Sequence, residues 1–299
     1  MKPLVSIIIV TYNSAKFILK CLNSIDKITY KNKEIIIVDN SSTDNTLKLI
    51  TGYRINLIKS DKNLGFGKAS NLGAKMASGK YLFFLNPDTE LADNEVLDKL
   101  VYEMEKDKIL GAISPFGYKY GDRAKRYHSV LYVNRYAMLL MIPIEMYKGR
   151  GYSRRFFGED ELNHNRDLLY VDCVQGSHLF VRRDLFNKLN GFDERFFFYC
   201  EDNDLCLRIW KSGYKVAIVL NAEIYHYGGG SSSSRIRVYE GVKSRTILIY
   251  LWNNSGLIMS CIFLLGAILK RIIQFRFSEI PLAVKGGYDG IKSVRIKKV

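Results

Sequence analysis

The chain has 299 residues, of which 47% are hydrophobic and 25% charged. This length and composition allow a full hydrophobic core and exclude a disordered or fibrous protein. Lys and Arg exceed Asp and Glu by a formal charge of +15, so we expect an anionic partner: a nucleic acid, an anionic membrane surface or a phosphorylated ligand. The five cysteines contain no CxxC pair, which argues against a disulfide framework or a zinc site and favours a reducing cytosol.

The first third of the chain alternates between strand and helix patterns. Residues 5–10 and 34–38 are near-continuous β-branched runs of strand length, and an apolar helical face at Leu19, Leu22 and Ile25 lies between them. The pattern continues with a helix through residues 47–50 capped by 42–44, a strand over 55–58, a helix over 68–77 and a strand over 81–85. This alternation predicts a doubly wound α/β sheet.

Polar residues follow three of these predicted strands, at 11–13, 39–41 and 86–88. Ligands of open α/β sheets bind at the carboxyl ends of the strands, so we expect these residues to converge. Asp39 suits a hydrogen bond with a nucleobase or a ribose, although a helix cap explains an Asp followed by polar residues equally well.

Residues 63–68, followed by Asn71, form a glycine-rich segment that is only loosely similar to a phosphate-binding loop. A helix that begins near Lys68 would favour a diphosphate at its N-terminus. The alternative is a plain left-handed turn before a helix.

Asp88 ends a predicted buried strand, and His226 ends a later one. A strand-end Asp usually caps a turn, and a lone His is more often a core or surface residue. Together, and with diphosphate oxygens completing the coordination shell, the two side chains suit Mg²⁺ or Mn²⁺.

An acidic segment at 201–204 precedes a further helical run. Acidic residues in a first helical turn interact favourably with the helix dipole without any catalytic role. This is the default explanation for two of the three acids Glu201, Asp202 and Asp204. Glu201 and Asp204 fall on one face of the helix and Asp202 lies about 100° away, so the three are not expected to share one role. The aromatic residues at 196–199 would desolvate a carboxylate and raise its pKa towards that of a useful base, or would simply be core.

Two further regions differ in composition from the alternating strands and helices. Residues 116–170 are rich in Tyr, Arg and Lys with weak periodicity, as in an insertion or lid. Residues 257–269 are an unbroken apolar stretch, shorter than the roughly 20 residues that span a membrane, and a basic tail follows them. We therefore expect one domain over 1–240 and a helical, basic extension over 241–299 that lies on an anionic membrane surface.

In this order the segments resemble the family 2 glycosyltransferases of the GT-A fold, and among them the bacterial rhamnosyltransferase-like enzymes that build surface polysaccharides. The resemblance covers the chain from Val5 to Ser231 apart from the middle insertion. Its motifs are VSIIIVTYN at 5–13, VDNSS at 38–42, NLGF at 63–66, Asn71, LNPD at 85–88, GFDE at 191–194, EDND at 201–204 and HxxGxS at 226–231. It implies a doubly wound mixed sheet flanked by helices, followed by the C-terminal membrane-associated extension.

The resemblance also implies a role for each candidate residue. The metal ligands would be Asp88 and His226, the catalytic base Asp202, and the residues that place donor or acceptor Glu201 and Asp204. The nucleotide-sugar donor would be bound by Thr11, Tyr12, Asn13, Asp39, Ser41, Gly65, Phe66, Asn71 and Asn86.

The implied reaction is a single in-line displacement that inverts the anomeric centre, because the motifs offer one base and no evident nucleophile. Asn86 stands where the family's DxD turn has its first Asp, as in many rhamnosyltransferase-like relatives. The donor would be dTDP-rhamnose first and a UDP-sugar second, and the acceptor a lipid-linked saccharide. The enzyme would be cytoplasmic and peripheral on the inner face of the cell membrane, and a homodimer is left open.

Two other classes of protein stay open. A basic nucleic-acid-binding protein would explain the charge of +15 but not the acidic strand ends. Because no helix-turn-helix, zinc-finger or RRM sequence is found, nucleic acid is not the expected partner. A non-catalytic nucleotide-sugar-binding partner would bind the donor without turnover.

Overall fold

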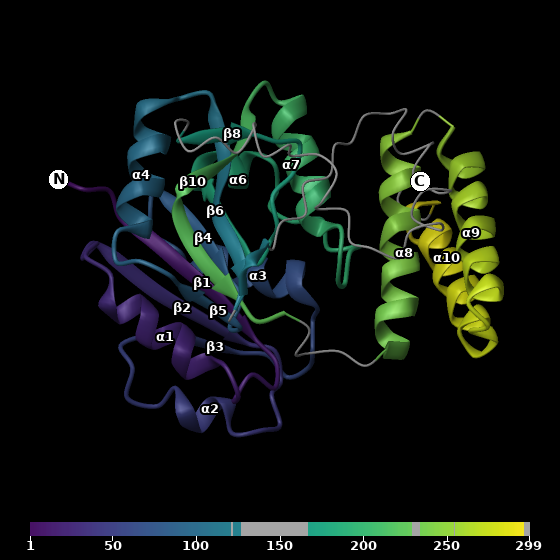
Figure 1. The fold of residues 1–299 in the computed structure, drawn as a ribbon, viewed down its shortest axis with the longest axis horizontal. Helices are drawn as coiled ribbons and strands as arrows, with labels where there is room; N and C mark the ends of the chain where they lie inside the picture. Colours follow the sequence, from purple (N-terminus) through teal and green to yellow (C-terminus); the bar gives the residue numbers. More distant parts are fainter. Residues whose placement is uncertain (121, 127–166, 229–233, 254, 296–299) are drawn as a thin grey trace.

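The computed structural model describes residues 1–120, 122–126, 167–228, 234–253 and 255–295 (Figure 1). Its strands are β1 (Val5–Thr11), β2 (Lys33–Asp39), β3 (Asn56–Lys59), β4 (Tyr81–Leu85), β5 (Thr89–Leu91), β6 (Leu110–Lys119), β7 (Asp122–Arg126), β8 (Leu168–Tyr170), β9 (His178–Arg182) and β10 (Lys215–His226). Its helices are α1 (Ile18–Lys27), α2 (Thr46–Leu49), α3 (Phe66–Met76), α4 (Val96–Lys106), α6 (Arg183–Lys188), α7 (Glu201–Lys211), α8 (Ser234–Trp252), α9 (Gly256–Ile273), the 3₁₀ helix η2 (Phe277–Glu279) and α10 (Ile280–Arg295).

The strands form a mixed sheet in the order β3-β2-β1-β4-β9-β6-β10-β5. β1 pairs in parallel with both β2 and β4, so the carboxyl ends of these three strands lie at one edge of the sheet. Beyond β4 the sheet becomes mixed, because β9 runs antiparallel to β4 and β6. The predicted mixed sheet flanked by helices is therefore confirmed.

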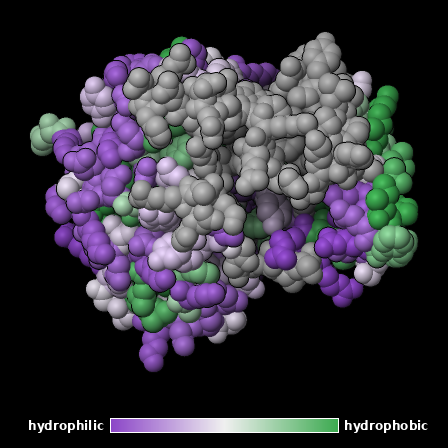
Figure 2. Space-filling model, in the orientation of Figure 1, coloured by the Kyte–Doolittle hydropathy of each residue, from purple (hydrophilic) through white to green (hydrophobic). Residues whose placement is uncertain are grey.

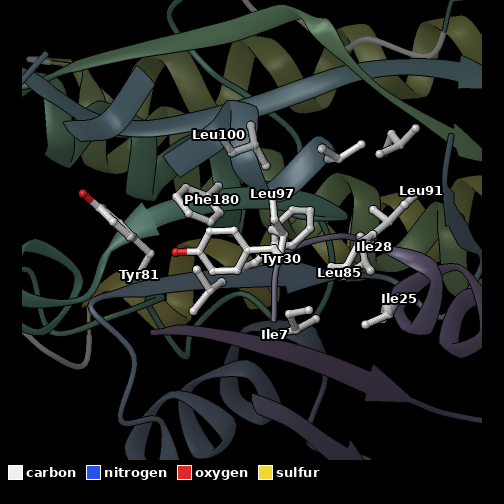
Figure 3. Close-up of a cluster of buried hydrophobic side chains, with 14 of the residues drawn as sticks. Ile7, Ile25, Ile28, Tyr30, Tyr81, Leu85, Leu91, Leu97, Leu100 and Phe180 are labelled. Atoms are coloured by element: carbon white, nitrogen blue, oxygen red, sulfur yellow. The ribbon is translucent and has the colours of Figure 1, made fainter. Parts of the chain in front are cut away.

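Alternate residues of the central strands enter two cores, one on each face of the sheet. Ile7 and Ile9 pack with residues of α1 and α4 (Figure 3), whereas Ile8 packs with residues of α3, α6 and α7. Phe180 of β9 joins the first core, with its ring centroid 5.1 Å from that of Tyr81. The strands are continuous apolar runs because helices cover both faces of the sheet. The polar loops begin where the covered part of each strand ends.

The helix expected at 47–50 is a single turn, α2, and its N-cap is Asn45 and not one of the predicted residues 42–44. Ser42 Oγ accepts a hydrogen bond from the Asn13 backbone N–H at 2.9 Å, and Asp44 Oδ2 accepts one from the Ala15 N–H at 3.0 Å. The loop thus ties the end of β2 to the end of β1.

Strand β6 continues to Lys119, so the first residues of the stretch expected as an insertion at 116–170 belong to the sheet. β7 pairs with β6, and β8 pairs with β10. Residue 121 and residues 127–166 of the expected insertion lie outside the described residues.

Helices α8, α9 and α10 pack together beside the sheet (Figure 1). α8 begins at Ser234, so the domain boundary expected after residue 240 falls inside this helix. α10 approaches α8 closely: a Cβ atom on Gly290 would lie 2.8 Å from the Lys243 carbonyl oxygen and 2.9 Å from Thr246 Cβ.

Helix α9 is much less buried than its neighbours. In the described part of the chain it is the helix with the length and apolar composition to cross a membrane, and 17% of it is buried. It also carries Cys261, which is exposed, whereas the other four cysteines are buried.

We expect Gly290→Ala to lower the free energy of unfolding by about 1–3 kcal/mol, since the added methyl group would force α10 away from α8. A Cβ atom on Gly241 of α8 would meet no atom of the described residues within 4 Å. Gly241→Ala should therefore stabilise the protein by up to about 1 kcal/mol. Urea unfolding followed by circular dichroism measures both values, and equal effects of the two substitutions would contradict the close packing of α8 and α10.

Candidate active site

The polar loops after β1 and β2 are joined around Asp39. Thr11 Oγ1 donates a hydrogen bond to Asp39 Oδ1 at 3.0 Å, and the Ser42 N–H donates one to Asp39 Oδ2 at 3.0 Å. Asn13 and Ser41 both have left-handed backbone, with φ of 50° and 68°. The structure thus brings together Thr11, Asn13, Asp39 and Ser41, four of the residues predicted to bind the nucleotide-sugar donor. Tyr12, between Thr11 and Asn13 in the chain, is half-buried.

The glycine segment docks on the residues that precede α7. Gly65 has a φ of +80°, and a Cβ atom on it would lie 2.2 Å from the Phe197 carbonyl oxygen, so this position requires glycine. That same oxygen accepts a hydrogen bond from the Phe66 N–H at 2.9 Å. Helix α3 begins at Phe66, two residues before the predicted start.

Asn71 of α3 holds the turn at Phe192. Its Nδ2 donates to the Phe192 carbonyl oxygen, and its Oδ1 accepts from the Phe192 N–H, both at 2.9 Å. A side chain on Gly191 would collide with Asn71 Oδ1, since a Cβ atom there would lie 2.5 Å away. Asn71 therefore links α3 to the segment before α7. Its predicted contact with a donor stays a prediction.

Asp88 and His226 are in direct contact, although they are far apart in the sequence. β10 pairs with β5 so that His226 is level with Thr89, and this register brings His226 Nε2 to 3.2 Å from Asp88 Oδ1. The side chains of Asp88 and His226 are 15% and 8% exposed. Asn86, half-buried in the same turn, donates its backbone N–H to the Ser177 carbonyl oxygen at 2.8 Å.

A second histidine, His178, lies beside this pair and was not singled out in the sequence. It starts β9 level with Leu85, it is 1% exposed, and its ring centroid is 6.2 Å from that of His226. Its Nδ1 lies 2.7 Å from Ser177 Oγ. No local pattern marks His178 as part of the site, because β9 reaches the sheet from a distant part of the chain.

The pair of Asp88 and His226 fits a divalent cation that is shared with a phosphorylated ligand. Within the described residues, no group of three or more His, Cys, Asp and Glu is arranged to hold a metal ion. Mg²⁺ in such sites is commonly held by one or two carboxylates together with substrate phosphates and water, and Mn²⁺ also accepts carboxylate ligands. Two protein ligands are therefore enough when a diphosphate supplies the rest.

Asp202 stands at the first turn of α7 and is held by two backbone groups. Its Oδ2 accepts the Gly176 N–H at 2.9 Å, and its Oδ1 accepts the Asn203 N–H at 2.8 Å. Burial raises its pKa above the usual value, and these two hydrogen bonds act in the opposite direction. Asp202 as a whole residue is half-buried, and its carboxylate is fixed in place and more basic than usual.

The other two acids of this turn have different surroundings. Glu201 is buried, and its Oε2 has no hydrogen-bond partner among the described residues. Burial first, and the charge of Asp202 second, raise the pKa of Glu201 well above its usual value. Asp204 accepts hydrogen bonds from Arg208 Nε at 2.8 Å and from Trp252 Nε1 of α8 at 2.9 Å. Their predicted role in placing donor or acceptor stays a prediction.

Comparison with known families identifies the class of this protein. The model of the family "Glycosyl transferase family 2" matches residues 6–189, and the chain belongs to this family. The model described as the N-terminal domain of galactosyltransferase matches residues 164–228. Together the two matches take in both strand-end loops, the Asp88 turn, α7 and His226.

The relatives of this chain include glycosyltransferases of several bacteria. It is 31% identical to glycosyltransferase GlyG of Streptococcus pneumoniae serotype 4 over 118 residues, 37% of this chain and 39% of GlyG. It is 28% identical to rhamnosyltransferase WbbL of Escherichia coli K12 over 238 residues, 75% of this chain and 83% of WbbL. It is 26% identical to N-acetylglucosaminyl-diphospho-decaprenol L-rhamnosyltransferase of Mycobacterium tuberculosis over 250 residues, 78% of each chain. The match thus spans about two-fifths of GlyG and most of the two rhamnosyltransferases.

Solved structures share the fold. S. aureus TarS (residues 1–349) has a TM-score of 0.58 at 17% identity, covering 97% of this chain and 80% of that one. The mannosyltransferase PcManGT from Pyrobaculum calidifontis, solved with GDP-Man and Mn²⁺, has a TM-score of 0.59 at 15% identity, covering 96% and 74%. The GT-A fold expected from the sequence is therefore confirmed.

We expect Glu201→Gln to stabilise the protein at neutral and alkaline pH by about 1–3 kcal/mol, because burial disfavours the Glu201 anion and its Oε2 has no hydrogen-bond partner among the described residues. A carboxyl whose pKa is raised by folding contributes stability below its unfolded pKa, ordinarily 4.5, and loses that contribution as the pH rises through the folded pKa. The gain should therefore shrink towards zero as the pH is lowered to about 4.5.

Urea unfolding between pH 5 and pH 8 measures this difference in the free energy of unfolding. Asp204→Asn is the matched control: Arg208 and Trp252 both donate to the Asp204 carboxylate, so this substitution should destabilise the protein. A Glu201→Gln effect that is constant across the pH range would argue against a raised pKa.

Proposed function

We propose that this chain is an inverting glycosyltransferase that moves a sugar from a nucleoside diphosphate donor to a hydroxyl group of an acceptor. The observation that carries the proposal is the Asp202 carboxylate, which is fixed by the Gly176 N–H and lies on the segment that docks against the Gly65-Phe66 loop. Membership of glycosyl transferase family 2 supports it.

The strand-end loops provide the donor site in this proposal. Each Asp39 oxygen accepts one hydrogen bond within the protein and has a further lone pair for a nucleobase or ribose. The Gly65-Phe66 backbone and Asn86 would border the diphosphate or the sugar. The formal charge of +15 favours such an anionic ligand.

Asp202 would act as the general base. It takes the proton of the acceptor hydroxyl while the hydroxyl oxygen bonds to the anomeric carbon, and the bond from that carbon to the diphosphate breaks. The raised pKa of Asp202 makes it a better proton acceptor than an exposed carboxylate, and its two backbone hydrogen bonds keep it oriented. We assign no nucleophile, so a single displacement inverts the configuration.

Asp88 and His226 would hold Mg²⁺ or Mn²⁺ next to the diphosphate. A bound divalent cation supplies positive charge to the departing nucleoside diphosphate. The contact between the two side chains keeps both at the strand edge where the donor is proposed to lie. Mn²⁺ is present in the solved structures of PcManGT and GalNAc-T7, which is consistent with this choice.

The names of the relatives favour a particular donor and acceptor. WbbL and the mycobacterial relative are both named as rhamnosyltransferases, so we propose rhamnose from dTDP-rhamnose first and a UDP-sugar second. The mycobacterial name also contains a sugar linked by diphosphate to a decaprenol, which supports a lipid-linked saccharide as acceptor. A role in bacterial surface polysaccharide synthesis is consistent with the similarity to the amylovoran biosynthesis glycosyltransferase AmsB of Erwinia amylovora.

Helices α8–α10 would form a second unit that binds the cytoplasmic face of the membrane. Apolar residues gather at the edge of the molecule where α9 lies (Figure 2), and Ile258 and Leu265 are 63% and 67% exposed. Leu264 packs on α10 instead, since a Cβ atom on Gly287 would lie 2.7 Å from it. One face of α9 thus contacts protein and the other is available to lipid. Basic residues that would favour anionic lipid are Lys270, Arg276, Lys285, Lys292 and Arg295.

We expect Asp202→Asn to lower kcat by about 10²–10⁴-fold and to leave donor affinity unchanged, because only proton transfer is lost. Release of nucleoside diphosphate from dTDP- and UDP-sugars, with acceptor present, measures kcat, and calorimetry measures donor affinity. Asp184→Asn is the control, since this exposed Asp also lies in a first helical turn, that of α6. Near wild-type turnover of Asp202→Asn would exclude Asp202 as the base.

Chelation with EDTA should abolish this turnover, and added Mn²⁺ or Mg²⁺ should restore it. Asp88→Asn should raise the metal concentration that is needed for half-maximal rate, because a charged ligand becomes a neutral one. Full activity in EDTA would contradict the metal site, whatever the donor.

We expect the protein to bind vesicles containing phosphatidylglycerol more tightly than neutral vesicles, and less tightly as salt is added. Leu265→Glu should weaken binding by about tenfold or more, because an apolar side chain is lost from the interface. Met76 of α3 is also exposed, at 58%, so Met76→Glu is a matched control that should bind as the wild type does. Resistance to extraction by alkaline carbonate would contradict a peripheral protein.

A further inference from the structure

The C-terminal helices pack directly on the residues that lead into α7. Phe196 and Cys200 are buried in one apolar cluster with Ile247 and Leu248 of α8 and Val294 of α10. The side chains of Tyr199, Leu207 and Trp252 pack against this cluster. The contact therefore lies on the segment that carries Asp202, and not on a remote face of the sheet.

Two hydrogen bonds from α8 lie on either side of Asp202. Ser244, which is completely buried, donates from Oγ to the Phe198 carbonyl oxygen at 2.8 Å. Trp252 donates from Nε1 to Asp204 Oδ1 at 2.9 Å, and this acceptor is ionisable and buried. Hydrogen bonds to a buried charged group are among the stronger ones in proteins.

The turn between these two bonds has a costly backbone conformation. Tyr199 and Cys200 are consecutive non-glycine residues with φ of +72° and +67°. Left-handed backbone is unfavourable for a residue with a side chain, and it persists only when its surroundings hold it. The surroundings here include α8 and α10, because Cys200 is buried against both.

We propose that α8 is a positioning element of the active site, in which Ser244 and Trp252 are positioning residues that hold the 198–200 turn and the first turn of α7. The inference rests on the proposed function of Asp202 as base and adds the group that orients it. The same segment contacts the Gly65-Phe66 loop, since the Phe197 carbonyl oxygen accepts a hydrogen bond from the Phe66 N–H. The fixed turn thus sets the direction of α7 and the contact of Asp202 with Gly176.

The test uses the full chain with Ser244→Ala and Trp252→Phe, singly and combined. Trp210 provides a matched control, because its Nε1 donates to the Asp172 carbonyl oxygen at 3.0 Å near the other end of the same helix. We expect the double variant to lower kcat by about 10–100-fold with KM for the donor unchanged. Trp210→Phe should keep the wild-type kcat.

Hydrogen exchange supplies a readout that does not need turnover. The amides of Gly176 and Asn203 both donate to Asp202, so they should exchange faster in the double variant and at the wild-type rate in Trp210→Phe. The amides of β1 and β4 report in the same experiment whether the fold is intact. Faster exchange at Gly176 would support the inference even if no donor is turned over, which would count against the proposed function alone.

Two results would overturn the inference. One is wild-type exchange at Gly176 and Asn203 in a folded double variant. The other is an equal loss of kcat in Trp210→Phe, because the effect would then follow from any weakening of α7 and not from the bonds to α8.

Discussion

The parallel pairing of β1 with both β2 and β4 is the constraint on which the rest of the site depends. It places three carboxyl ends at one edge of the sheet, so that polar residues separated along the sequence meet without any long loop. The antiparallel strands add two histidines at this edge. β10 brings His226 to Asp88, and β9 begins with His178 beside them. Two apolar cores, one on each face, hold this edge in place.

The acids of α7 illustrate how position separates side chains of the same chemistry. Glu201 is buried, and one of its oxygens has no hydrogen-bond partner in the described part of the chain. Asp202 is held by backbone N–H groups, and Asp204 is bound by Arg208 and by Trp252. The Glu201 carboxylate is thus disfavoured as an anion, the Asp202 carboxylate is oriented by backbone groups, and the Asp204 carboxylate forms structural hydrogen bonds. Neighbouring residues of one helical turn differ this much because each faces a different element of the fold.

The sequence predicted the features that depend on local patterns. The strands β1 to β4 follow from apolar runs of strand length, and the meeting of Asp88 with His226 follows from their places at strand ends. The features that escaped prediction depend on contacts between distant segments. Nothing local marks β9 as the neighbour of β4, and nothing local marks Trp252 as the partner of Asp204. Helix α2 has Asn45 as its N-cap, one residue after the predicted capping residues 42–44, because Ser42 bonds to the β1 loop.

The distribution of cysteines makes α9 chemically distinct from the rest of the chain. Cys21 and Cys200 are buried, and burial raises the pKa of each thiol to about 12, so their reactive thiolate forms are suppressed. Cys173 and Cys206 are also enclosed, whereas Cys261 is exposed. A maleimide dye added to the native protein should therefore label α9 alone, without any engineered residue. Its emission would then report whether this helix is surrounded by water, protein or lipid.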